Sequence, residues 1–182
     1  ETRELLSQAY VNANNFNKAI EYIEALSKRT PAIDRAFQKA TYLKGTELYN
    51  KEEYAEAVGF FEKSLQYPVD PAYVADAAFW CAETYSIGRK YEQAIPQYER
   101  SLGSSPKTEL LRAIRYALGY AHYNLQHYEV ALQNFKEFAA RSSANDPNYA
   151  DGMLRLGDSY YATKAYSEAL SSYKKVIQMN SP

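Results

Sequence analysis

The residues that could support chemistry in this chain of 182 amino acids are few and scattered. Two histidines, His122 and His127, are five residues apart, which does not place both on one face of a helix. No nearby cysteine or carboxylate completes a metal site around them, and no neighbouring serine or cysteine offers a nucleophile. His122 takes a place that holds tyrosine in three other parts of the chain, so we expect it to be a core substitute. The pattern therefore predicts no enzyme activity, metal or cofactor.

Other kinds of chemistry find as little support. The seven glycines are scattered and form no phosphate-binding loop, and Glu52-Glu53 lies in a polar turn where carboxylates are solvated. The single cysteine, Cys81, excludes an intramolecular disulfide and is expected to be a small buried apolar side chain. A net charge of -1 argues against nucleic-acid binding, and no apolar run approaches the ~20 residues of a membrane-spanning helix. We expect neither nucleic-acid binding nor direct membrane insertion.

The elements that position side chains come instead from an internal repeat. A small residue is followed nine residues later by an aromatic residue, and three residues after that by alanine. This pattern occurs five times, with the alanines 38, 37, 37 and 38 residues apart. The five copies are Ser7/Phe16/Ala19, Gly45/Tyr54/Ala57, Ala82/Tyr91/Ala94, Gly119/Tyr128/Ala131 and Gly157/Tyr166/Ala169.

Each repeat predicts two helices joined by a short turn, because apolar residues recur at helical spacing on both sides of a short polar segment. The small residue and the alanine allow the two backbones to approach to roughly 8–9 Å. The aromatic residue that begins the second helix is expected to fill the space beside them. Pro96 falls inside a second helix, where a missing N–H predicts a kink, and Gly59 takes the same place one repeat earlier.

Four dipeptides predict where the first helix of a repeat begins, because each pairs an N-cap side chain with proline at the first helical position. The chain ends on the same signal, Ser181-Pro182, and Glu1 already lies within an expected helix. Both ends are therefore expected to be cut from a longer array, with further repeats or domains in the same protein. The four signals are Thr30-Pro31, Asp70-Pro71, Ser105-Pro106 and Asp146-Pro147.

This pattern resembles the tetratricopeptide repeat, which also has a second aromatic residue four positions after the alanine. That place holds Ile23, Phe61, Tyr98, Phe135 and Tyr173. The chain departs from the family pattern in three ways. The bulky aromatic residue four positions before the small residue is missing, Lys44 replaces an expected core aliphatic residue, and the period is 37–38 residues instead of about 34. The long period is similar to bacterial cell-envelope members, so a periplasmic or envelope location is expected, with the cytoplasm as the alternative.

The resemblance implies an all-α, right-handed superhelical α-solenoid of five helix-turn-helix hairpins. The expected repeats cover approximately residues 1–29, 31–67, 71–104, 106–142 and 147–180. In this family the first helices line a concave groove that binds a peptide or helix of a partner protein. Carried over to this sequence, the groove residues expected to bind are Tyr42, Tyr49, Phe79, Glu83, Tyr116, Tyr120, Tyr123, Asn124, Asp158 and Tyr161.

This expected groove is aromatic, and it is also acidic because one lysine faces five carboxylates. Aromatic side chains give large contact areas at low entropic cost, which favours peptide binding. The residues that set the charge are Glu4, Asp76, Glu83, Asp151 and Asp158 against Lys39.

Structural roles compete with binding for several of these residues. Asp76 and Asp151 lie in first helical turns, where a carboxylate favours the helix dipole. Packing onto a neighbouring hairpin is the alternative role for Tyr49, Tyr123 and Tyr161. For Phe79, Tyr116 and Tyr120 we expect binding. Asn12, Asn50 and Asn124 share one place, where closing the first helix is favoured over binding a peptide backbone.

The predicted function is a non-catalytic scaffold for protein–protein interaction. One alternative is a regulatory or substrate-recruiting segment of a larger enzyme or of an envelope or secretion machine. Another is self-association through an uncapped last helix, which carries Leu170, Tyr173, Val176 and Ile177.

Overall fold

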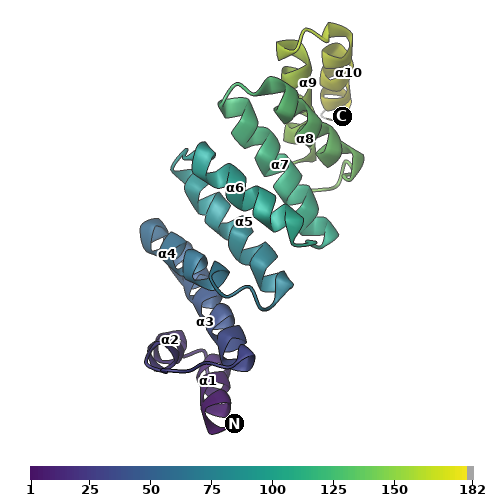
Figure 1. The fold of residues 1–182 in the computed structure, drawn as a ribbon. Helices are drawn as coiled ribbons and strands as arrows, with labels where there is room; N and C mark the ends of the chain where they lie inside the picture. Colours follow the sequence, from purple (N-terminus) through teal and green to yellow (C-terminus); the bar gives the residue numbers. More distant parts are fainter. Residues whose placement is uncertain (180–182) are drawn as a thin grey trace. The chain divides into compact units, whose positions relative to one another are not determined.

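Residues 1–179, which the computed structural model describes, form ten α-helices and no strand (Figure 1). Consecutive helices pair as antiparallel hairpins, which confirms the predicted helix-turn-helix repeat. The Ser181-Pro182 signal lies outside the described residues. The helices are α1 (Thr2–Asn12), α2 (Phe16–Glu24), α3 (Pro31–Asn50), α4 (Tyr54–Leu65), α5 (Pro71–Ile87), α6 (Tyr91–Gly103), α7 (Thr108–Asn124), α8 (Tyr128–Ala140), α9 (Tyr149–Ala162) and α10 (Tyr166–Met179).

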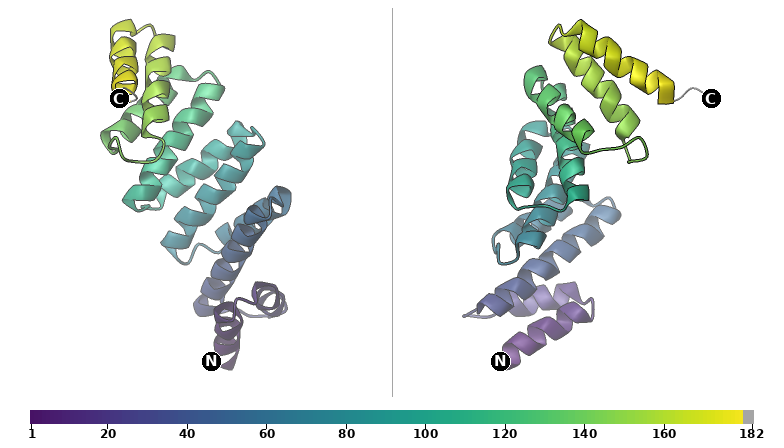
Figure 2. Two further views of the ribbon diagram at one scale, coloured as in Figure 1. Left: turned by 180° about the vertical axis from the view of Figure 1, so that it is seen from behind. Right: turned by 90° about the vertical axis from the view of Figure 1, so that its right-hand side faces the viewer.

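The hairpins gather into two compact units, Glu1–Pro106 with three hairpins and Lys107–Pro182 with two. In the first unit, α1 and α2 pack against α3, and α3 and α4 pack against α5. In the second unit, α7 and α8 pack against α9, and the right-hand view of Figure 2 shows α9 and α10 side by side. Each unit therefore builds its core by stacking one hairpin on the next.

The turn inside every hairpin has the same backbone conformation. One exposed residue takes a φ of 55–64°, and the N–H of the next residue donates to the carbonyl five positions earlier. In the third hairpin, for example, Lys90 N–H donates to Tyr85 O at 3.0 Å. This left-handed residue closes the first helix as a C-cap does. The five residues are Asn14, Glu52, Arg89, Gln126 and Lys164.

The small residue of each repeat makes room for the second aromatic ring. A Cβ atom built on Gly45 would lie 2.8 Å from the Phe61 ring, and one on Gly119 would lie 2.8 Å from Phe135. The prediction that the first aromatic residue fills this space is wrong. Tyr54 instead makes an edge contact with Tyr49 across the turn, with ring centroids 5.5 Å apart. The equivalent rings of the fourth and fifth repeats make the same contact, at 5.4 and 5.3 Å.

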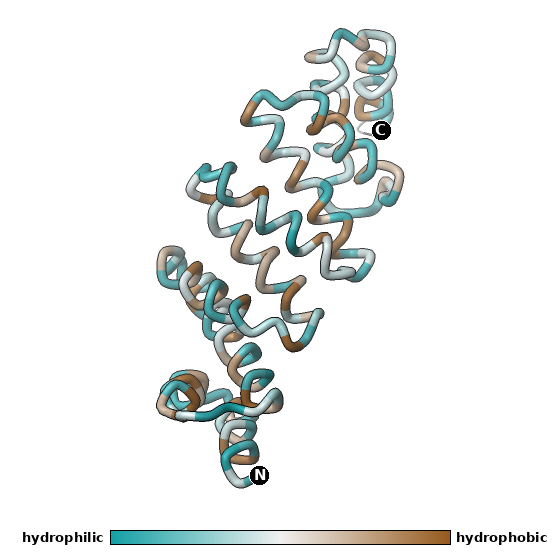
Figure 3. Tube along the Cα trace, in the orientation of Figure 1, coloured by the Kyte–Doolittle hydropathy of each residue, from teal (hydrophilic) through white to brown (hydrophobic). Residues whose placement is uncertain are grey.

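The repeat alanines lie in the core as predicted, with exposed fractions of 0–2%. Cys81 is also fully buried, which confirms its role as a small apolar side chain, and burial raises the pKa of its thiol to about 12. Hydrophobic and hydrophilic positions alternate along the helices of both units (Figure 3). Within the described part of the chain, no helix combines the length and the apolar character needed to cross a bilayer.

Two of the four predicted helix starts are confirmed. The Thr30 hydroxyl accepts the Ile33 N–H at 3.4 Å, and the Asp70 carboxylate accepts the Ala72 N–H at 2.9 Å. Each side chain satisfies a backbone donor that the first turn of a helix leaves open.

The other two predicted starts are wrong. Ser105 adopts φ 55°, and α7 begins at Thr108 with Lys107 as its N-cap. The Asp146 carboxylate accepts the Ser143 N–H at 2.6 Å and pairs with Arg112 at 2.8 Å, while α9 begins later at Tyr149. Ser105 and Asp146 therefore lie in loops, through backbone conformation and a side-chain hydrogen bond respectively. The proline that follows each of them also precedes the helix.

Pro96 and Gly59 both lie on exposed faces of second helices. Helix α6 runs continuously from Tyr91 to Gly103 through Pro96, and the kink there stays a prediction. A Cβ atom on Gly59 would meet nothing within 4 Å. Both residues are exposed on α4 and α6, so the outward faces of these helices can carry weak helix formers.

Candidate functional site

Three of the predicted groove residues line one pocket in the second unit. Tyr120, Tyr123 and Asn124 come from the last turns of α7, and Arg155 of α9 completes the pocket, whose volume is about 130 Å³. Positions three and four apart share a helix face, which is why the end of α7 presents these three side chains together. We call Tyr120, Tyr123, Asn124 and Arg155 the tyrosine–arginine pocket.

Ring contacts and a backbone bond fix the α7 side of this pocket. The Asn124 amide donates to Tyr120 O at 2.8 Å, and Asn124 is the last residue of α7, which favours the helix-closing role. The Tyr123 ring lies 5.4 Å from that of Tyr128, and Tyr120 lies 5.6 Å from Tyr116. Tyr120 and Tyr123 are half-buried, whereas Asn124 is exposed. The tyrosines thus pack on one side and leave the other side open to the pocket.

Arg155 is the pocket residue that the sequence reasoning missed. Its Nη1 donates to Asp158 at 2.9 Å, its Nη2 lies 3.6 Å from Asp151, and its guanidinium lies 5.5 Å from the centre of the Tyr120 ring. The Nε atom is buried without a hydrogen-bond partner among the described residues. The signal in the sequence was the pair of aspartates at positions four before and three after the arginine.

Tyr116 contacts the pocket residue Tyr120 and is not itself part of the lining. Its hydroxyl donates to Asp151 at 2.7 Å, which joins α7 to α9, and its ring lies 5.4 Å from Phe138. Burial and this hydrogen bond raise the pKa of the Tyr116 hydroxyl. The contacts of Tyr116 therefore hold the two helices of the pocket together.

In the first unit, the predicted groove aromatics mainly pack. Phe79 is only 9% exposed and contacts Trp80 and Tyr98, which favours packing over binding, and its binding role stays a prediction. Tyr49 lies 5.0 Å from Trp80 of the next hairpin, which confirms the packing alternative for it. Tyr42 is half-buried and lies 5.4 Å from Tyr73. The rings of Tyr42 and Tyr49 therefore reach the next hairpin, whereas that of Phe79 packs within its own hairpin.

The two mid-helix carboxylates have internal partners. The Tyr98 hydroxyl donates to Glu83 at 2.5 Å, and the Tyr173 hydroxyl donates to Asp158 at 2.8 Å. Burial raises the pKa of Glu83, and burial with the bond to Asp158 raises the pKa of Tyr173 to about 12. In the five repeats an acid follows the small residue only where the second aromatic is tyrosine, so the sequence did contain the signal.

Other acidic groups of the expected groove are also engaged. Glu4 accepts from the Thr30 hydroxyl at 2.6 Å, and Asp151 interacts with both Tyr116 and Arg155. Tyr161, also predicted as a binding residue, is 61% exposed beside Tyr166 and does not line the tyrosine–arginine pocket. These bonds give the carboxylates structural roles that the sequence interpretation did not assign.

The two histidines meet across the turn between α7 and α8. Their Nδ1 atoms are 3.3 Å apart, which the five-residue spacing did not suggest. His122 is half-buried and His127 is exposed. Among residues 1–179, no group of three or more histidine, cysteine or acidic side chains is arranged to hold a metal ion.

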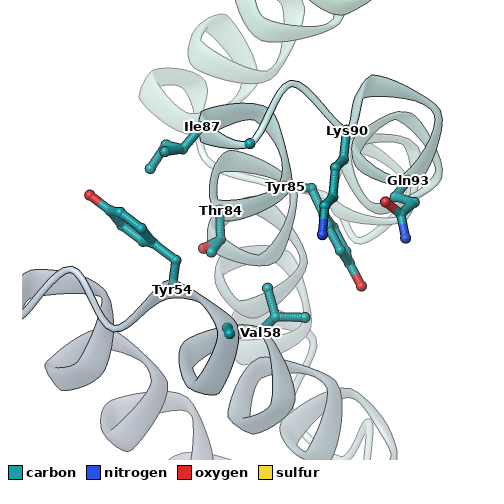
Figure 4. A pocket seen from close by; sticks show the side chains of 9 residues that line it. Tyr54, Val58, Thr84, Tyr85, Ile87, Lys90 and Gln93 are labelled. Atoms are coloured by element: carbon teal, nitrogen blue, oxygen red, sulfur yellow. The ribbon is translucent and has the colours of Figure 1, made fainter.

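A second, larger pocket lies in the first unit, between the start of α4 and the turn that joins α5 to α6 (Figure 4). Its volume is about 420 Å³. Tyr54 and Val58 contribute from α4, Ile87 ends α5, and Lys90 and Gln93 come from the start of α6. We call this the turn pocket, and of the predicted groove residues in the first unit none lines it.

Sequence comparison identifies the repeat. The family profile described as "Tetratricopeptide repeat" matches residues 5–73 and 116–182, more than half of the chain. The chain belongs to the tetratricopeptide repeat family. Together with the ten helices, this assigns an all-α helical-repeat solenoid.

Solved structures of tetratricopeptide proteins share this fold. One is YrrB, described as "a TPR protein with an unusual peptide-binding site", with a TM-score of 0.68 and 19% identity over 98% of this chain and 84% of that chain. Another is MamA from Desulfovibrio magneticus RS-1, with a TM-score of 0.64 and 18% identity over 98% of this chain and 93% of that chain. Because the sequence identities are below 20%, these similarities support the fold alone.

A curated relative is the small glutamine-rich tetratricopeptide repeat-containing protein 2 of Saccharomyces cerevisiae. It is 34% identical over 91 residues, which are 50% of this chain. The aligned part is 24% of that protein, so the chain spans about a quarter of its length. The relative therefore supports the repeat itself.

Proposed function

We propose that this tetratricopeptide array is a non-catalytic scaffold that binds a segment of a partner protein at the tyrosine–arginine pocket. Tetratricopeptide proteins are generally interaction modules, and a structural neighbour is described by its peptide-binding site. The observation that carries the proposal is the convergence of Tyr120, Tyr123, Asn124 and Arg155 on one pocket. Aromatic and arginine side chains dominate the energetics of protein interfaces, and all but one of these four residues are aromatic or arginine.

The geometry favours a segment with exposed backbone carbonyl groups. The buried Nε of Arg155 has a hydrogen atom to donate, and the Asn124 amide can both donate and accept. A buried donor gains most when a ligand oxygen satisfies it. Asp151 and Asp158 already interact with Arg155 and with tyrosine hydroxyls. The aromatic surface and the donors of Arg155 and Asn124 therefore contribute more to binding than the acidic charge does.

An affinity-capture experiment tests this function. We would compare the wild-type chain with Tyr123→Ala/Asn124→Ala, which removes two pocket side chains and leaves the Tyr116–Asp151 bond intact. Tyr161→Ala is the matched control because this tyrosine is exposed and lies outside the pocket. We expect a partner that the wild type and the control capture and the double variant loses. Equal capture by all three proteins, with unchanged circular dichroism, would refute the proposal.

Self-association is a second candidate function, supported by the exposed apolar side chains of the last hairpin. Leu170 is 54% exposed and Tyr166 is 57% exposed. Tyr173, expected to be part of this face, is partly buried and bonded to Asp158. Sedimentation velocity over a range of concentrations tests this candidate, and a strictly monomeric species at high concentration would count against it.

A further inference from the structure

The turn pocket differs from the corresponding place in the other repeats in two ways. The residue five positions after the small residue is asparagine in three repeats and alanine in the fifth, but in the third repeat it is Ile87. Ile87 is 49% exposed at the pocket, where an asparagine would normally close the helix in water. An exposed isoleucine offers apolar surface that the hairpin does not use for its own packing.

The second difference is a lysine at the N-cap of α6, a position that cations do not favour. Lys90 is the N-cap of α6 and makes no side-chain capping bond. Asparagine and acidic residues suit this place, because the start of a helix attracts negative charge and repels a cation. In the first two repeats the same position holds Asn15 and Glu53. Lys90 therefore breaks the local rule, which is common at functional sites.

The two unusual residues line the same pocket. Figure 4 shows Ile87 near Tyr54 and Lys90 beside Tyr85, with Val58 between them. No ion pair joins Lys90 to another side chain in residues 1–179. The volume of about 420 Å³ lies within the usual range for ligand pockets. An apolar wall and an available cation thus face one space.

The corresponding place between α8 and α9 in the second unit lacks both features. Leu132 stands where Val58 does, Ala162 replaces Ile87, and Ala165 replaces Lys90. A larger side chain at the base and a smaller one at the edge leave less apolar wall, and alanine stands in place of the lysine. The repeat thus provides an internal comparison in which the same backbone carries a different surface.

We infer that the turn pocket is a second peptide-binding site, distinct from the tyrosine–arginine pocket. It takes a peptide segment with one large apolar side chain next to an acidic residue. The apolar side chain lies against Val58, Tyr54 and Ile87, and the partner carboxylate pairs with Lys90. The same carboxylate faces the positive end of the α6 dipole, which adds to the attraction.

A selection from a phage-displayed library of random dodecapeptides on the immobilised full chain tests this inference. We expect some of the selected peptides to share a leucine-, isoleucine- or phenylalanine-sized residue with aspartate or glutamate within two positions. Synthetic versions of these peptides are then measured by fluorescence anisotropy against the wild-type chain and against variants. This order of work identifies the peptide before any variant is interpreted.

Two variants copy residues that the other repeats carry at the same places, so they should keep the fold. Ile87→Asn should weaken binding at least about tenfold through lost apolar contact. Lys90→Ala should weaken binding about two- to fivefold, and high salt should remove this difference because the pair is near the surface. Tyr123→Ala/Asn124→Ala is the control and should leave these peptides unaffected.

The outcomes separate the two proposals. Peptides that depend on Ile87 and Lys90 but not on Tyr123 and Asn124 support the second site. A selection that yields only peptides dependent on Tyr123 and Asn124 supports the proposed function and overturns this inference. A selection with no peptide that depends on Ile87 and Lys90, including one without binders, also overturns it.

Discussion

The hydrogen bond between Tyr98 and Glu83 gives a quantitative test of how a hairpin of this array is held together. Tyr98 is 1% exposed, and its hydroxyl donates to Glu83 at 2.5 Å. A hydrogen bond to a charged group contributes about 1.5–3 kcal/mol, and losing one partner leaves the other desolvated. We therefore expect Tyr98→Phe to lower the free energy of unfolding by about 2 kcal/mol at neutral pH.

The second repeat supplies the matched change at the other partner, because it combines Thr46 with Phe61 at the same two places. Glu83→Thr alone leaves the Tyr98 hydroxyl with only Ser86, at 2.9 Å, and should cost about 1–2 kcal/mol. The double variant Tyr98→Phe/Glu83→Thr recreates the pair of the second repeat. We expect it to be more stable than the sum of the single effects predicts, by about 1–2 kcal/mol.

Urea unfolding measures all four proteins of this cycle. Far-ultraviolet circular dichroism follows the helices, and the single tryptophan, Trp80 in α5, reports on the same hairpin. Tyr161→Phe is the control for losing a tyrosine hydroxyl, because Tyr161 is largely exposed, and it should change stability by less than about 0.5 kcal/mol. If the two single effects add within about 0.3 kcal/mol, the residues are not coupled and the reasoning fails.

Three further predictions concern packing, reactivity and pH. Gly119→Ala should destabilise the chain by about 1–3 kcal/mol, because its Cβ would lie 2.8 Å from the Phe135 ring, whereas Gly59→Ala should stabilise it by about 0.5–1 kcal/mol; urea unfolding of both variants checks the opposite signs. The Cys81 thiol, with its pKa raised to about 12 by burial, should react slowly with a disulfide reagent in the native chain and rapidly in urea, and equal rates would contradict its burial. Burial raises the pKa of Glu83 above 4.5, so the folded chain binds this proton more readily and its stability falls as pH rises through the raised pKa. Glu83→Gln should therefore gain stability relative to the wild type over that pH range, and parallel pH profiles would be the contrary result.

The fold was predictable because the repeat gives many independent signals for the same hairpin. The five alanines, the turn segments and the apolar spacing all agree, and the structure buries those alanines. Helix starts were predictable where the cap side chain accepts a first-turn N–H, as those of Thr30 and Asp70 do. Asp146 failed as a cap because the Ser143 N–H and Arg112 engage its carboxylate, and Arg112 lies too far away in the sequence for a local pattern to indicate the contact.

The candidate site was harder to predict because one helix face serves both packing and binding. Tyr120, Tyr123 and Asn124 were found, since they lie together near the end of one helix. Phe79 is 9% exposed because its ring packs against Trp80 of the same helix and Tyr98 of α6, contacts that the repeat pattern did not indicate. Arg155 was missed because the two aspartates at helical spacing indicate its ion pairs but not a pocket, which forms only between helices of two hairpins.

The left-handed turn residue described above has a consequence for how such arrays can vary. The residue that follows it donates its N–H to a carbonyl near the end of the first helix. This hydrogen bond holds the turn conformation, so glycine is not required there. All five occurrences are polar and exposed, yet their charges differ, as in Glu52, Arg89 and Lys164. The side chain of the turn residue can therefore be exchanged between hairpins without a change in the core. Recognition can diversify at the turns while the helices that support them stay fixed.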